Sequence, residues 1–188
     1  RDPEMSRGLG DVYKRQWYDW FCFQHWPDKY DAWWGIDTLP AVNENAPAYR
    51  DFIIRGEDSI IRHWLRCGAD GWRLDVADEL PDDFIEEIRA VMEQEKPDSF
   101  LLGEVWEDGS NKIAYSRRRR YLLGRETHGL MNYPLRTATL DYIRRGSAAA
   151  FRATMEEQRE NYPPAAFYSG LNILGTHDTP RILSLIHI

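Results

Sequence analysis

The sequence predicts an α/β protein with a parallel sheet, and two observations support that class. The chain has 188 residues, of which 43% are hydrophobic and 29% are charged. This composition is typical of a globular protein and not of a disordered chain or a collagen-like repeat. Short apolar segments alternate along the chain with longer segments whose apolar residues recur at helical spacing. Such alternation is typical of β/α units, whose strands pair in parallel.

The predicted strands are short, apolar and bounded by turn residues. They cover residues 72–76, 100–105, 128–132 and 171–175. Upstream of them, residues 17–34 are predicted to form loop or short helix, and residues 36–45 a loop that carries Pro40. Five of the eight tryptophans fall within residues 17–34. We expect most of these five to serve packing, since large aromatic rings dominate core energetics.

The predicted helices follow the apolar periodicity. They cover residues 48–66 with an interruption near Gly56, a segment from Asp82 or Asp83 to Pro97, and residues 134–145 and 147–162. The second helix presents one apolar face, made of Phe84, Ile85, Ile88, Val91 and Met92. Trp64 is predicted to belong to the core, and Ser147 to cap the last helix. The four arginines at residues 117–120 are predicted to form a solvated helix face.

Charge and cysteine content exclude several classes of partner. The chain carries 24 basic and 31 acidic residues, a net charge of −7, which is the wrong sign for a nucleic-acid-binding protein. No apolar run approaches the roughly 18 residues that cross a bilayer, so no membrane contact is expected. Cys22 and Cys67 are too few for a disulfide framework and lack the spacing of a metal site, which fits a reducing compartment.

The two ends of the chain are related to each other through their coding DNA. Residues 11–16, DVYKRQ, can be encoded by DNA whose reverse complement encodes LSLIHI, the sequence of residues 183–188. We interpret both segments as a translated sequencing-library adaptor, with residues 1–10 belonging to the same non-native tail. Residues 17–182 are then expected to be an internal piece of a larger protein.

Three predicted strands each end near a carboxylate. The segments are GWRLD at residues 71–75, LLGEVW at 101–106 and ILGTHD at 173–178. The carboxyl ends of parallel strands share one edge of a sheet, where chemistry gathers in α/β folds. We therefore expect Asp75, Glu104 and Asp178 to converge at that edge.

The surroundings of each carboxylate indicate a chemical role. Arg73 and Asp75 lie two residues apart and share a strand face, so the cation should orient Asp75 and keep it ionised, as a nucleophile requires. Glu104 follows an apolar strand and lies near Trp106, and partial desolvation there suits a general acid. A carboxylate cluster without a thiol points to glycoside cleavage, in which one carboxylate attacks the sugar and another protonates the leaving oxygen.

Each of these residues also has a plainer interpretation. A single acidic residue at a strand end is most often a cap or a surface charge, and an Arg–Asp pair can be purely structural. His177 could bind a metal, but no second histidine stands at ligand spacing. His25 and His63 are interpreted as structural. The recurrence of acidic residues at the ends of three predicted strands favours the functional interpretation.

The motifs resemble those of the alpha-amylase family, glycoside hydrolase family 13. GWRLDVADE at residues 71–79 resembles the nucleophile motif, LGEVW at 102–106 the acid/base motif, and GTHDTPR at 175–181 the transition-state-stabiliser motif. LPAVN at 39–43 resembles a motif of the short domain after the third barrel strand, and MNYPL at 131–135 a segment of the neopullulanase and cyclomaltodextrinase branch.

This resemblance implies a partial TIM (β/α)8 barrel, about strands four to seven, with the end of the short domain after strand three. It implies retaining hydrolysis of α-glucosidic bonds in maltooligosaccharides, cyclodextrins, pullulan or starch. Asp75 would be the nucleophile and Glu104 the general acid/base, and Asp178 with His177 would bind sugar hydroxyls. Arg73 would position the nucleophile. The remaining two residues, Trp106 and Glu79, would line the leaving-group side.

The resemblance leaves several points open. A glucanotransferase or a glucosyl isomerase would use the same triad, and a non-catalytic carbohydrate-binding barrel would lose carboxylates. Calcium occurs in the family, but no all-oxygen loop is evident here, so neither a metal nor another cofactor is assigned. The intact protein is expected to form a homodimer through an N-terminal domain. The family's motif on strand three is absent, and we predict that the fragment alone is inactive and poorly stable because its sheet edges are open.

Overall fold

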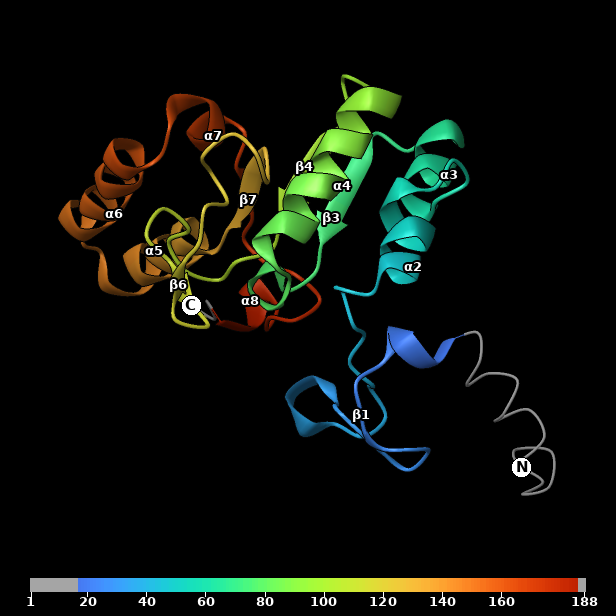
Figure 1. The fold of residues 1–188 in the computed structure, drawn as a ribbon. Helices are drawn as coiled ribbons and strands as arrows, with labels where there is room; N and C mark the ends of the chain where they lie inside the picture. The colour runs from blue at the N-terminus through green and yellow to red at the C-terminus, as the bar shows by residue number, and fades with distance from the viewer. Residues whose placement is uncertain (1–16, 186–188) are drawn as a thin grey trace. The chain divides into compact units, whose positions relative to one another are not determined.

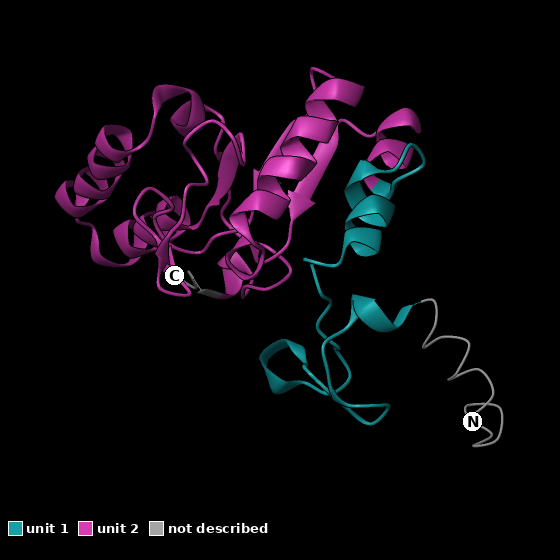
Figure 2. Cartoon of the chain, viewed as in Figure 1, with its two compact units in different colours: residues 1–60 teal, residues 61–188 magenta. Residues whose placement is uncertain are grey.

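The computed structural model describes residues 17–185. Of the two predicted adaptor segments, residues 1–16 and the last three residues of 183–188 lie outside the described residues. The chain divides into two compact units, residues 1–60 and residues 61–188 (Figure 2). Each unit is described by itself.

The first unit consists of short elements. They are the 3₁₀ helix η1 (Tyr18–Trp20), the strands β1 (Phe23–His25) and β2 (Lys29–Tyr30), η2 (Trp33–Gly35), α2 (Pro47–Arg50) and the π-helix η3 (Asp51–Arg55). Strands β1 and β2 form an antiparallel hairpin where the sequence predicted loop or short helix. Strands of two or three residues are too short to show an alternating pattern, which explains the wrong prediction. The predicted interruption of the helix near Gly56 is confirmed, because η3 ends at Arg55.

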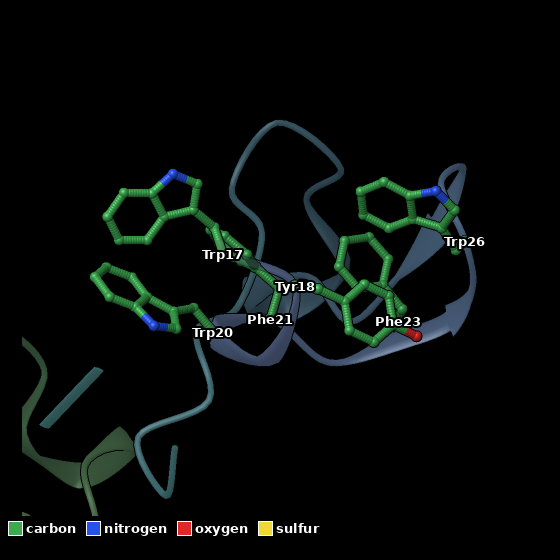
Figure 3. A pocket seen from close by; sticks show the side chains of 6 residues that line it. All are labelled: Trp17, Tyr18, Trp20, Phe21, Phe23 and Trp26. Carbon is green, nitrogen blue, oxygen red and sulfur yellow. The ribbon is translucent and has the colours of Figure 1, made fainter. Parts of the chain in front are cut away.

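Aromatic rings pack against one another in this unit (Figure 3). The ring centroids of Trp17 and Trp20 lie 4.2 Å apart, and those of Phe23 and Trp26 lie 4.6 Å apart. Edge-to-face contacts of this kind stabilise a cluster beyond the area it buries. The cluster lines a pocket of about 460 Å³ formed by Trp17, Tyr18, Trp20, Phe21, Phe23 and Trp26. The predicted packing role therefore fits three of the five tryptophans, whereas Trp34 is exposed.

The second unit is organised around a parallel four-stranded sheet (Figure 1). Its strands, in spatial order, are β3 (Gly71–Leu74), β4 (Phe100–Gly103), β7 (Gly129–Asn132) and β8 (Leu171–Asn172). The register pairs Leu74 with Gly103 and Gly103 with Leu130. Chain order and spatial order agree, as expected for successive β/α units, so the α/β prediction is confirmed.

Helices and short elements precede, connect and follow these strands. They are α3 (Ile60–Arg66), η4 (Ala77–Glu79), α4 (Asp82–Glu95), the hairpin of β5 (Ile113–Ala114) and β6 (Arg117–Arg118), α5 (Tyr133–Arg145), α6 (Ala148–Asn161), α7 (Pro164–Tyr168) and α8 (Ile182–Leu185). The predicted apolar face of α4 is buried throughout. Ser147 caps α6 by accepting a hydrogen bond from the backbone N–H of Ala150 at 3.3 Å, as predicted. Gly71 is required by close packing, since a Cβ there would lie 1.9 Å from the carbonyl oxygen of Phe100.

Two predictions about this unit were wrong. The arginines at residues 117–120 do not form a solvated helix, because β6 belongs to a hairpin and the Arg119 side chain is only 5% exposed. Arg119 is buried because it pairs with Asp82 and donates to backbone carbonyls, contacts that a sequence pattern cannot show. Trp64 is exposed on α3, whereas Ile61 and Leu65 of the same helix are buried. Trp64 therefore lies at the edge of the buried face of α3 and not within it.

Candidate active site

The first carboxylate lies where β3 ends. The strand stops at Leu74, and Asp75 is the next residue. The Arg73 guanidinium donates from Nη1 to Asp75 Oδ1 at 2.7 Å, so the predicted pair is confirmed as a contact. The Asp75 side chain is 69% exposed, which leaves it accessible to a ligand. Val76 then adopts a left-handed conformation with φ 41°, a costly backbone state for a β-branched residue.

Glu104 occupies the equivalent position after β4 and is far more buried. Its side chain is 2% exposed. Oε2 accepts a hydrogen bond from the Val76 backbone N–H at 2.9 Å and lies 3.0 Å from Arg73 Nη2. Oε1 accepts from Trp106 Nε1 at 3.2 Å and from the Tyr133 hydroxyl at 3.3 Å. These three hydrogen bonds and the ion pair with Arg73 offset the cost of burying the carboxylate. The sequence predicted the burial and one neighbour, Trp106, but not the other donors.

Arg73 therefore joins the first two carboxylates. Its Nη1 contacts Asp75 and its Nη2 contacts Glu104, so both carboxylates lie on the same side of the sheet. Its Nε donates to the sulfur of Met131 on β7 at 3.2 Å. Burial opposes the charge of Arg73, but the hydrogen bond to Asp75 and the charge of Glu104 raise the pKa of the guanidinium. The Arg73 guanidinium thus stays protonated, and it is held by contacts with Asp75, Glu104 and Met131.

Asp178 lies farther from its strand than predicted. Strand β8 ends at Asn172 and not at residue 175, so Asp178 belongs to a turn beyond the strand. The turn is closed by the Thr176 N–H donating to Thr179 Oγ1 at 2.9 Å, and the Asp178 N–H donates to Thr176 Oγ1 at 3.3 Å. His177 Nε2 lies 3.1 Å from Asp178 Oδ2, so the two predicted hydroxyl-binding residues are in contact.

Tyr133 connects this turn to Glu104. Its hydroxyl lies 3.4 Å from Thr176 Oγ1 in addition to its contact with Glu104. Its ring stacks on Trp106 with centroids 4.4 Å apart and an angle of 11° between the planes. Burial raises the pKa of Tyr133, with a smaller contribution from the charge of Glu104, so the phenol stays protonated. The structure thus brings the three carboxylate-bearing loops into one hydrogen-bonded cluster.

Glu79 is placed differently from the other predicted residues. It belongs to η4, after β3, and accepts a hydrogen bond from the Tyr115 hydroxyl on the β5–β6 hairpin. Together these two residues help line a pocket of about 410 Å³ between η4 and the hairpin. Half of the Trp106 side chain is exposed, which leaves part of its ring available for stacking. Of the two predicted leaving-group residues, Trp106 contacts the cluster directly and Glu79 borders the neighbouring pocket.

Sequence reasoning missed Met131, Tyr133 and Thr176. Met131 and Tyr133 lie two residues apart in the MNYPL segment, which was noted only as a resemblance. The available signal was that residues i and i+2 at a strand end share one face, the rule that had been applied to Arg73 and Asp75. Among the described residues, no group of three or more His, Cys, Asp or Glu side chains could hold a metal ion. No helix in that part of the chain is long and apolar enough to cross a membrane.

The geometry defines an α/β protein with a carboxylate site at the carboxyl edge of a parallel sheet. One exposed carboxylate, Asp75, and one buried carboxylate, Glu104, contact the same guanidinium at this edge, and glycoside hydrolases also use a pair of carboxylates. The chain belongs to the alpha-amylase catalytic-domain family, whose model matches residues 10–187. The four parallel strands are accordingly part of a (β/α)8 barrel, and the fold predicted from the resemblance is confirmed.

Relatives of the chain carry names that describe α-glucan chemistry. It is 35% identical to an amylopullulanase of Thermoanaerobacter thermohydrosulfuricus, over 94% of this chain and 13% of that protein. It is 32% identical to a cyclomaltodextrinase of a Bacillus species, over 97% of this chain and 32% of that protein. A solved structure of the cyclic alpha-maltosyl-(1→6)-maltose hydrolase from Arthrobacter globiformis matches with a TM-score of 0.81 at 26% identity, covering 95% of this chain and 40% of that chain. The chain thus spans less than half of each of these relatives.

Proposed function

We propose that the protein carrying this segment hydrolyses α-glucosidic bonds of maltooligosaccharides, cyclodextrins, pullulan or starch, with retention of configuration. The observation that carries the proposal is the single Arg73 guanidinium that holds Asp75 and Glu104 on one side of the sheet. Retaining glycosidases need two carboxylates close enough to act on the same bond. The names of the relatives support α-glucans as the substrate class.

The proposed reaction has two displacements. In the first, an Asp75 oxygen attacks the anomeric carbon, the glycosidic C–O bond breaks, and Glu104 gives its proton to the leaving oxygen. In the second, Glu104 takes a proton from water as the water oxygen attacks the same carbon and breaks the ester to Asp75. Asp178 and His177 would hold sugar hydroxyls, Trp106 would offer its exposed face to the leaving unit, and Glu79 would border it from η4. No step requires a metal.

The test uses the intact protein from which the segment is expected to derive. Wild type and Asp75→Asn are compared on maltotriose, pullulan and β-cyclodextrin, and Asp70→Asn serves as control because Asp70 is exposed and pairs with Lys96 away from the cluster. We expect wild type and Asp70→Asn to release reducing sugar and Asp75→Asn to lose activity by about a thousandfold or more. Absence of cleavage by wild type, or an unchanged Asp75→Asn rate, would refute the proposal.

The products separate hydrolysis from the alternative chemistries. A hydrolase converts maltotriose into shorter sugars only, a glucanotransferase also produces longer chains, and a glucosyl isomerase produces a trisaccharide of the same mass with a different linkage. Chromatography of the products over the first few per cent of conversion distinguishes the three.

A further inference from the structure

Strand β7 contributes no carboxylate to the site. One side chain on the strand and one directly after it nevertheless contact residues of the site. Met131 lies within the strand, and Tyr133 is the first residue of α5 directly after it. Met131 contacts Arg73 and Tyr133 contacts Glu104. Both side chains are buried, and with Leu102 they form one apolar cluster against which Ile173 packs. Apolar packing therefore holds both side chains in place, independently of their contacts with charged groups.

Met131 completes the set of contacts that orients Arg73. The guanidinium is planar and has five N–H donors in a fixed fork. Its two Nη atoms contact Asp75 and Glu104, and the Met131 sulfur is the acceptor for Nε. A planar group held at three nitrogens cannot rotate within its plane without breaking a contact. The sulfur thus helps to set the separation of the two carboxylates.

Tyr133 suits both protonation states of Glu104. Its hydroxyl can donate one hydrogen bond and accept others, unlike the Trp106 indole, which only donates. When Glu104 is a carboxylate, the Tyr133 proton points to Oε1. When Glu104 is protonated on that oxygen, the Tyr133 hydroxyl can accept a hydrogen bond from it and donate one to Thr176 Oγ1, 3.4 Å away. The other groups that face Glu104 are Arg73 and the Val76 N–H, which are donors only.

We propose that Met131 and Tyr133 are the positioning residues of this site: Met131 fixes the fork of Arg73, and Tyr133 holds Glu104 in both protonation states. The inference rests on the proposed function, since two protonation states are needed only if Glu104 acts as acid and then as base. In this proposal, residues at the end of β7 align Arg73, which lies on β3, with Glu104, which directly follows β4. Neither residue is assigned a covalent or proton-transfer step of its own.

The variant Tyr133→Phe tests the second half of the proposal in the intact protein. It keeps the ring that stacks on Trp106 and removes only the hydroxyl. We expect kcat on maltotriose to fall about tenfold with KM within about twofold, because small misplacements at a reacting centre are costly. The alkaline limb of the kcat/KM–pH profile should move to higher pH, since the lost hydrogen bond is charge-assisted and therefore stronger when Glu104 is a carboxylate than when it is protonated. A lower unfolding midpoint with an unmoved limb would overturn this assignment.

The variants Met131→Leu and Met131→Gln test the first half. Leucine keeps the volume and removes the acceptor, whereas the glutamine amide oxygen restores an acceptor for Arg73 Nε. We expect kcat to fall about three- to tenfold in Met131→Leu and to recover at least in part in Met131→Gln. Leu130→Met is the matched control, because Leu130 lies on the opposite face of β7 and packs against Gly103 and Gly109. Equal losses in both Met131 variants, or none in either, would overturn the role of the sulfur.

The failure of this inference is distinguishable from the failure of the proposed function. If wild type cleaves no α-glucan, the proposed function fails. The positioning role is then still decided by a pH titration of the ¹³C-labelled Glu104 carboxyl carbon by NMR. Tyr133→Phe must raise the midpoint of that titration relative to wild type. An identical midpoint in the two proteins overturns the inference whether or not the wild type is active.

Discussion

Two clusters of arginines and carboxylates lie in the second unit, and they differ in what the arginine contacts. In the Arg73 cluster, made of Arg73, Asp75 and Glu104, the guanidinium contacts only side chains, and one of them, Asp75, is exposed. The Arg119 cluster consists of Arg119, Arg120, Asp82, Glu86 and Glu126. Its buried guanidinium donates to the carbonyls of Ala77, Asp78 and Leu80 and lies 2.7 Å from Asp82.

The difference shows that residue type alone does not define a functional site. Arg119 ties the hairpin after β4 to the loop after β3, because most of its donors bind backbone carbonyls of that loop. Arg73 instead contacts two carboxylates and the Met131 sulfur, and one of those carboxylates, Asp75, is exposed to solvent. A cluster that holds the backbone together stabilises the fold, and a cluster that aligns exposed acids can react with a ligand. The comparison predicts that substitutions in the Arg73 cluster lower activity and that substitutions in the Arg119 cluster lower stability.

The largest expected effect is on catalysis, from Glu104→Gln. The amide cannot donate the proton that the leaving oxygen needs, so kcat on maltotriose should fall by about 10²–10⁴-fold. α-Maltosyl fluoride, whose leaving group needs no proton, should lose much less in kcat/KM, which reports the first displacement and not the later step in which Glu104 acts as base. Similar losses on both substrates would contradict the role of Glu104 as general acid. Glu126→Gln, which also neutralises a buried glutamate but in the Arg119 cluster, is the matched control.

The next effect is on stability, from Arg119→Met. The change removes the nearest cation of Asp82 and the donor of three backbone carbonyls, of which the contact with Ala77 is buried and the other two are part-buried. The free energy of unfolding should therefore fall by about 3–5 kcal/mol. Urea unfolding of wild type and variant measures the difference. A loss below about 1 kcal/mol would show that Arg119 is not a structural clamp.

A smaller effect, dependent on pH, is expected from Glu126→Gln. Burial, with the charge of Asp82, raises the pKa of Glu126 to about 7 from 4.5. Its folded-state pKa exceeds the unfolded value, so the folded protein binds the proton more tightly and loses stability as pH rises from about 4.5 through about 7. Glutamine removes that penalty. We expect the variant to be more stable than wild type by about 2 kcal/mol near pH 8, allowing for solvent screening, and nearly equal near pH 5. A difference independent of pH would refute this account.

The smallest effect is expected from Arg120→Ala. Arg120 belongs to the same cluster, and its Nη2 lies 3.0 Å from Glu86, but half of its side chain is exposed. Exposed ion pairs contribute little, so the free energy of unfolding should fall by less than about 1 kcal/mol. Comparison with Arg119→Met in the same urea experiment isolates burial as the variable. Equal losses in the two variants would mean that burial does not set the difference.

Much of the local structure followed from the sequence. The apolar face of α4, the cap at Ser147 and the strands that carry Arg73 and Glu104 were predicted at nearly their observed positions. These features depend on neighbours within a few residues, whose spacing is fixed by the geometry of a helix or a strand. The same reasoning overextended β8 to residue 175 and assigned the arginines at 117–120 to a helix, because short strands and buried ion pairs leave no periodic signal.

The sequence by itself thus determined the class of fold, the acidic residues at the ends of β3 and β4, and the pairing of Arg73 with Asp75. Only the tertiary structure decided that the same arginine reaches Glu104, that Met131 and Tyr133 support the pair from β7, and that Arg119 is buried. These contacts join residues on different strands and loops, and they depend on sheet register, which places Leu74 opposite Gly103 and Gly103 opposite Leu130. Register is set by the packing of whole elements, so spacing along the chain does not encode it locally.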